Sequence, residues 1–89
     1  MKVGVIGSGG REHAICISLK KSKNIDKIYC FPGNAGTSFI AENIEIELNN
    51  FEELKRVIKE LGIDIIIVGP EKPLVDGIVD FLELNKIKV

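Results

Sequence analysis

The sequence predicts an α/β fold, an open parallel sheet with helices on both of its faces. Three apolar runs, at 2–6, 27–31 and 63–69, alternate with segments whose apolar residues recur at helical spacing. In the third run, "IDIIIVG", five of seven residues are apolar, which is typical of a parallel strand buried on both faces. Strands that alternate with helices in this way favour a Rossmann-like sheet with right-handed crossovers.

The first half of the chain supplies two strands and one helix. "KVGVI" (2–6) is a short apolar run ended by glycine, and "KIYCF" (27–31) is a second run stopped by "PGN". Between them, "GREHAICISLKKS" (10–22) has apolar residues at roughly helical period and ends in lysines, so we expect a helix.

The second half begins less clearly. Residues 35–48 favour a helical turn around Ser38–Glu42, followed by an alternating edge strand, "NIEIEL" (43–48). "NNFEELKRVIKELG" (49–62) is the clearest helix of the chain, because an asparagine can cap its start and Gly62 can end it.

Helical spacing returns once more near the end of the chain, over residues 70–85. The final "KIKV" (86–89) has the composition of a strand that is just beginning. We therefore expect the chain to be a single domain, residues 1–89, that forms the first piece of a longer protein.

Composition disfavours several classes of partner. Twelve basic residues are balanced by thirteen acidic ones without a long run of one sign, so the sequence lacks the basic footprint of a nucleic-acid binder. No apolar run approaches the ~20 residues that span a bilayer. We expect a cytoplasmic protein without a membrane partner, in which Cys16 and Cys30 are reduced, buried thiols rather than a disulfide or a metal site.

The glycine-rich stretch "GSGG" (7–10) lies between the first strand and the first helix. Glycines at such a turn expose backbone N–H groups, and the helix dipole favours an anion there, so the chemistry on offer is phosphate binding. A dinucleotide site requires a third glycine where this chain has Glu12, and an acidic residue where it has Phe31 and Pro32. These two departures disfavour a dinucleotide.

Two side chains after the turn allow more than one interpretation. Arg11 stands in the first helical turn, where the dipole disfavours a positive charge unless an anion is bound beside it. Arg11 could equally point into solvent or pair with Glu12 or another carboxylate. For His13, a packed, hydrogen-bonded structural role is favoured over a catalytic one.

Two further loops are expected to meet the glycine-rich turn. Ligands of doubly wound sheets bind beyond the carboxyl ends of the strands, where the winding reverses, here between the strands at 2–6 and 63–69. "PGNAGT" contains Asn34, either a donor to a phosphate or hydroxyl or only a turn residue. "GPEKP" contains Glu71, held between two prolines, which suits either sugar hydroxyls or the first turn of a helix.

Three motifs in this order, "GSGGREHA", "PGNAGT" and "VGPEKPLVDGIVD", resemble the N-terminal domain of the phosphoribosylamine–glycine ligases, also called glycinamide ribonucleotide synthetases. The resemblance runs from the first strand to the last helix. It implies a Rossmann-like pre-ATP-grasp domain of a longer ATP-grasp ligase. Gly4 and Cys16 depart from the larger or different apolar residues that we expect in this family.

The resemblance also implies a function and a set of site residues. The whole enzyme would join 5-phosphoribosylamine to glycine in purine biosynthesis, using ATP and Mg²⁺ (or Mn²⁺) bound mainly outside this segment. Gly9, Gly10 and Arg11 would hold the 5-phosphate, with Asn34 nearby, and Glu71 would contact the ribose hydroxyls. The segment itself would contain no catalytic residue and no metal ligand, and the protein would be a monomer.

Two alternatives stay open on the sequence alone. The chain could be a stand-alone nucleotide- or sugar-phosphate-binding module without catalysis, which a stop codon after Val89 would favour. It could also be a dehydrogenase-type cofactor domain, which would bind a dinucleotide tightly.

Overall fold

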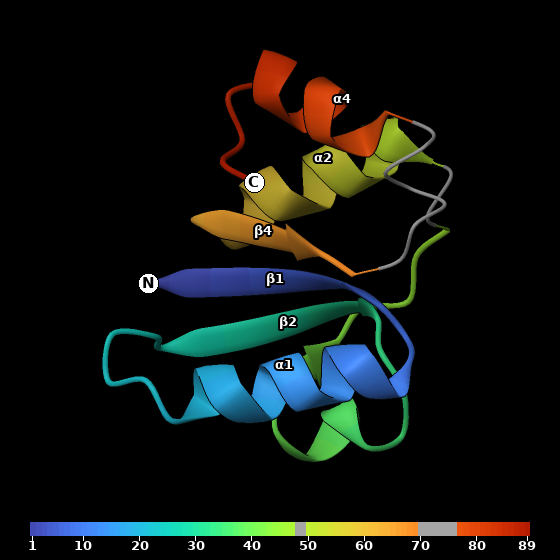
Figure 1. Ribbon diagram of the computed structural model, residues 1–89. Helices are drawn as coiled ribbons and strands as arrows, with labels where there is room; N and C mark the ends of the chain where they lie inside the picture. Colours follow the sequence, from blue (N-terminus) through green and yellow to red (C-terminus); the bar gives the residue numbers. More distant parts are fainter. Residues whose placement is uncertain (48–49, 70–76) are drawn as a thin grey trace.

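The sheet has four parallel strands in the order β3-β2-β1-β4, and Figure 1 shows it between helices. The computed structural model describes residues 1–47, 50–69 and 77–89. The elements in chain order are β1 (Lys2–Gly7), α1 (Gly10–Lys20), β2 (Lys27–Pro32), the 3₁₀ turn η1 (Thr37–Phe39), β3 (Glu42–Asn43), α2 (Phe51–Leu61), β4 (Ile65–Val68) and α4 (Ile78–Leu84).

The winding of the sheet reverses at β1, as predicted. β1 pairs in parallel with β2 along its whole length, from Lys2 opposite Lys27 to Gly7 opposite Pro32. On its other side β1 pairs with β4, with Ile6 opposite Val68. The carboxyl ends of the three strands therefore lie side by side, and the segments that follow them begin at one edge of the sheet.

Helices cover both faces of the sheet, which confirms the predicted fold class (Figure 1). α1 covers one face, where Cys16 is buried against Val3, Val5 and Cys30. α2 and α4 cover the other face over a larger cluster of buried residues: Ile6, Tyr29, Phe31, Leu54, Ile58, Ile66, Ile78, Leu82 and Ile87. Hydrophobic burial on two faces explains why the strands read as continuous apolar runs rather than alternating ones.

Gly4 is explained by this second cluster. A Cβ at Gly4 would lie 2.7 Å from Cδ1 of Ile66 and 3.0 Å from Cε2 of Phe31. The two large neighbours fill the space that a side chain at position 4 would need. Core packing therefore accounts for glycine at this position.

Local signals set the ends of α2 as expected. The side-chain oxygen of Asn50 accepts a hydrogen bond from the N–H of Glu53 (3.2 Å), which identifies Asn50 as the N-cap. Gly62 ends the helix in the left-handed region, with φ of 70°, where a Cβ is disfavoured.

The segment before α2 differs from the prediction. The expected edge strand over 43–48 is only the two-residue β3, and the expected helical turn is η1, which lies slightly earlier in the chain. The N–H of Ile44 still donates to the carbonyl oxygen of Cys30 in β2 (2.7 Å), whereas the side chains of Ile44 and Ile46 pack, partly buried, against the cluster beneath α2. Residue 48 lies outside the described residues.

At the end of the chain, α4 is described from Ile78, and the start of the predicted helix, residues 70–76, lies outside the described residues. Residues 86–89 are not assigned as a strand, but the N–H of Ile66 donates to the carbonyl oxygen of Lys88 (2.9 Å). The chain end thus runs beside the free edge of β4. Across the described ranges, none of the helices combines the length and the apolarity needed to cross a bilayer.

Candidate functional site

Two hydrogen bonds hold the loops after β2 and β4 to the end of β1. The N–H of Gly33 donates to the carbonyl oxygen of Gly7 (3.0 Å), and the N–H of Gly69 donates to that of Ile6 (3.1 Å). The glycine-rich turn at 7–10 therefore emerges between the two loops, as the predicted reversal of winding requires.

Asn34 connects the loop after β2 to this turn. Its Nδ2 donates to the carbonyl oxygens of Ser8 (2.8 Å) and Gly9 (3.3 Å). Its Oδ1 accepts from the N–H of Thr37 (2.9 Å), which closes the turn that carries Asn34 itself. Asn34 is thus both a turn residue and a tether of the glycine-rich turn, and its amide protons face protein carbonyl groups.

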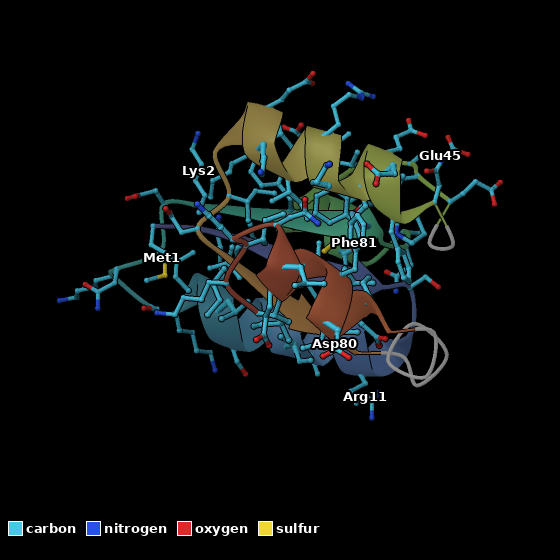
Figure 2. The ribbon with its side chains drawn as sticks, turned by 90° about the horizontal axis from the view of Figure 1, so that it is seen from above. Met1, Lys2, Arg11, Glu45, Asp80 and Phe81 are labelled. Atoms are coloured by element: carbon cyan, nitrogen blue, oxygen red, sulfur yellow. The ribbon has the colours of Figure 1, made fainter. Side chains whose placement is uncertain are left out.

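Arg11 connects the same turn to the other side. Its guanidinium donates a hydrogen bond to the carbonyl oxygen of Gly69, so it joins the first turn of α1 to the end of β4. The residue is otherwise exposed, and Figure 2 shows it at the surface of the molecule. A guanidinium has five N–H donors, so a bond to one carbonyl leaves it able to bind an anion as well.

Gly9 and Gly10 form the exposed amino end of α1. Gly9 is the N-cap, and Gly10 is the first helical residue. A Cβ on Gly10 would meet no atom of the described residues within 4 Å, and one on Gly9 would meet only Oε2 of Glu12, at 3.2 Å. Among the described residues, packing does not require glycine at position 10, which leaves room for a ligand above the N–H groups of the helix end.

Glu12 lies beneath the turn, and the sequence did not indicate this. Its side chain is 5% exposed, and its carboxyl group lies over Gly7 and Gly69. Sequence reasoning treated Glu12 as a missing glycine or as a possible partner of Arg11. Its place in the motif could have indicated the burial, because the third glycine of G-x-G-x-x-G serves close packing of the helix on the strand.

His13 packs against the loop after β2. A Cβ on Gly36 would lie 2.6 Å from Cε1 of the half-buried His13 ring. This close contact fits the structural role expected for the imidazole. It also explains why residue 36, the second glycine of "PGNAGT", is glycine although its backbone φ of −67° is one that any residue adopts.

One predicted residue of the site remains outside these contacts. Glu71, expected to contact the ribose, lies outside the described residues. In the ranges 1–47, 50–69 and 77–89, no three His, Cys, Asp or Glu side chains are grouped so that they could hold a metal ion.

The two cysteines lie in the core behind α1. Their sulfur atoms are 3.2 Å apart, both side chains are fully buried, and both thiols are free, as predicted. The pKa of Cys16 is raised to about 12. The largest cause is burial, and the hydrogen bond to Cys30, the charge of Cys30 and the charge of Glu12 add to it. The Cys16 thiol is therefore protonated at neutral pH and is a packing group rather than a nucleophile.

The family model described as phosphoribosylglycinamide synthetase, N domain, matches residues 1–89. Among curated proteins, the phosphoribosylamine–glycine ligase of Caldanaerobacter subterraneus subsp. tengcongensis is 52% identical over 89 residues, and that of Clostridium acetobutylicum is 43% identical over 89 residues. Each match covers 100% of this chain and 21% of the relative. The chain thus spans about a fifth of the length of these ligases.

A solved structure supports the same relationship. The crystal structure of phosphoribosylamine–glycine ligase from Thermotoga maritima matches with a TM-score of 0.63 at 32% sequence identity. The match covers 80% of this chain and 16% of that one.

Proposed function

The chain belongs to the family of phosphoribosylglycinamide synthetase N domains, and from this premise we propose that it is the pre-ATP-grasp N-terminal domain of a phosphoribosylamine–glycine ligase. Residues 1–89 form one domain of a longer ATP-grasp enzyme of purine biosynthesis. That enzyme joins 5-phosphoribosylamine to glycine to give glycinamide ribonucleotide, with ATP converted to ADP and phosphate. It works as a monomer in the cytoplasm.

One observation carries the proposal beyond family membership. The glycine-rich turn is held from both sides, by Asn34 through Ser8 and by Arg11 through Gly69. A turn fixed in this way keeps the N–H groups at the start of α1 in place before a ligand arrives. Preorganised donors of this kind favour binding of an anion, because little order has to be imposed when the ligand binds.

The domain contributes binding and orientation. Gly9 and Gly10 let the 5-phosphate approach the backbone N–H groups, and the Arg11 guanidinium adds a charge-assisted hydrogen bond. Asn34 holds the turn, and Glu71 contacts the ribose hydroxyls. The amine of the substrate is thereby presented to the rest of the ligase.

ATP and Mg²⁺ (or Mn²⁺) are assigned mainly to the other domains of the ligase. ATP supplies the phosphoryl group that activates the glycine carboxylate. No residue of this domain takes part in that step, so the isolated chain should have no ligase activity.

A chimeric enzyme tests the proposal. Residues 1–89 replace the matching segment of the Caldanaerobacter ligase, which is 52% identical, and the chimera should ligate phosphoribosylamine to glycine. Arg11→Ala should raise KM for phosphoribosylamine by about tenfold or more, because a charge-assisted hydrogen bond is lost, while KM for glycine and ATP changes much less.

A second arginine provides the matched control. Arg56→Ala removes a guanidinium from the exposed face of α2, where it pairs with Glu60, and should leave all three KM values unchanged. A folded but inactive chimera would favour a stand-alone binding module. Equal effects of Arg11→Ala on all three substrates would contradict the assignment of the phosphate site.

A further inference from the structure

The carboxyl group of Glu12 occupies a socket made by three glycines. A Cβ on Gly7 would lie 2.2 Å from Oε1 of Glu12, one on Gly69 would lie 2.5 Å from the same atom, and one on Gly9 would lie 3.2 Å from Oε2. Glu12 and Thr37 are the two buried polar or charged side chains of the described residues. The glycines therefore make room for a side chain of the protein itself.

The position of this socket is informative. Gly7 ends β1 and Gly69 follows β4, so the carboxyl group lies where the winding of the sheet reverses. In dinucleotide-binding domains the glycines at this crevice let the pyrophosphate approach the backbone closely. Here the same crevice already contains an acidic side chain.

We propose that Glu12 determines the specificity of the site by closing this crevice to a pyrophosphate. The side chain fills the volume over Gly7 and Gly69, and a carboxylate there would repel a diphosphate. A single phosphate is restricted to the outer side of the turn, above Gly10, where the structure leaves space. The site therefore accepts a sugar monophosphate and excludes nucleotide diphosphate compounds such as ADP-ribose.

This inference rests on the proposed function in one respect, since it takes the turn at 7–10 to be a phosphate site. Different ligands test the proposed phosphate site and the proposed role of Glu12. Binding of ribose 5-phosphate by the unchanged chain tests the phosphate site. A gain of ADP-ribose binding in a variant tests Glu12, whatever the result with ribose 5-phosphate.

The experiment opens the socket and measures binding by titration calorimetry. Glu12→Gly turns residues 7–12 into "GSGGRG", which restores G-x-G-x-x-G. We expect this variant to bind ADP-ribose at least about tenfold more tightly than the unchanged chain, because a like charge and its volume are removed. Glu12→Ala empties most of the socket and should show a gain in the same direction.

Glu12→Gln is the matched control. It keeps the volume of the side chain and removes its charge, so any gain in ADP-ribose binding should be smaller than that of the Gly variant. Folded Gly and Ala variants without any gain would overturn the proposal, as would a gain in the Gln variant as large as that in the Gly variant. If both the Gly and the Ala variant failed to fold, Glu12 would be a structural residue and the proposal would be wrong.

Discussion

The side-chain amide of Asn34 donates a hydrogen bond to the carbonyl oxygen of Ser8 over 2.8 Å, and this bond joins two loops that are 26 residues apart in the chain. The same amide nitrogen also donates to the carbonyl oxygen of Gly9, and Oδ1 of Asn34 accepts a hydrogen bond from the N–H of Thr37. Nδ2 therefore fixes the glycine-rich turn relative to the loop after β2, and Oδ1 fixes the shape of that loop. The shape of the proposed phosphate site therefore depends on Asn34 on one side, as it does on Arg11 on the other.

Replacing this amide should weaken both the fold and the site. In Asn34→Asp a carboxylate oxygen would face the carbonyl oxygens of Ser8 and Gly9 in place of an N–H donor. We expect the free energy of unfolding to fall by about 1–3 kcal/mol in urea titrations, and ribose 5-phosphate to bind less tightly. Asn24→Asp, at an exposed position, should change stability by less than about 0.5 kcal/mol. Equal effects of the two variants would contradict the role of Asn34.

Replacing Gly10 should weaken phosphate binding without lowering the stability of the fold. A Cβ at Gly10 meets no atom of the described residues within 4 Å, and alanine is a better helix former than glycine. Gly10→Ala should therefore leave the free energy of unfolding unchanged or raise it by up to about 1 kcal/mol. Binding of ribose 5-phosphate should weaken, because the new methyl group stands above the N–H groups of the helix end. Undiminished binding, measured by calorimetry, would argue against a phosphate at this position.

Replacing Gly36, unlike replacing Gly10, should lower the stability of the fold. A Cβ there would lie 2.6 Å from Cε1 of His13, so Gly36→Ala must displace the imidazole or the loop. We expect a loss of about 1–3 kcal/mol in thermal or urea unfolding, typical of overpacking. Adding His13→Ala should restore part of the stability in a double-mutant cycle. Additive effects of the two substitutions would show that the contact does not matter.

Cys16 should make stability depend on pH in the alkaline range. Its pKa is about 12 in the folded protein and 9.0 for the free group, so between these values the unfolded chain releases the proton first. The Cys16 contribution to the free energy of unfolding is constant below pH about 9 and decreases as pH rises toward about 12. Cys16→Ala should lack this part of the slope. Ellman's reagent should react with neither buried thiol of the native protein at neutral pH, but with both in concentrated urea.

The sequence predicts those parts of the fold that rest on local signals. The strands at 2–6 and 27–31 and the helix with Asn50 and Gly62 at its ends are found where residue pattern and capping indicated. The edge strand was predicted too long, because alternation reports burial of one face without saying what covers it. Pairing with β2 extends only to the backbone bond from Ile44 to Cys30, and the side chains of Ile44 and Ile46 are partly buried against the layer beneath α2.

The site was predictable as a meeting of loops but not in its contacts. The topology followed from the order of strands, so the neighbourhood of Gly9 and Asn34 could be expected. The bond from Arg11 to Gly69 spans 58 residues and leaves no trace in local pattern. The burial of Glu12 was missed because an acidic residue in a first helical turn is ordinarily an exposed one, favoured there by the dipole alone.

A titration of the ¹⁵N-labelled chain with ribose 5-phosphate, followed by amide chemical shifts, tests the central claim most directly. The account predicts that the largest changes fall on the N–H groups of Gly9, Gly10 and Arg11 and on the side-chain amide of Asn34. The Arg11→Ala chain should show the same pattern only at much higher ligand concentration. Shifts confined to another surface, such as the hollow beside Phe39 and Lys20, or no shifts at all, would contradict the claim.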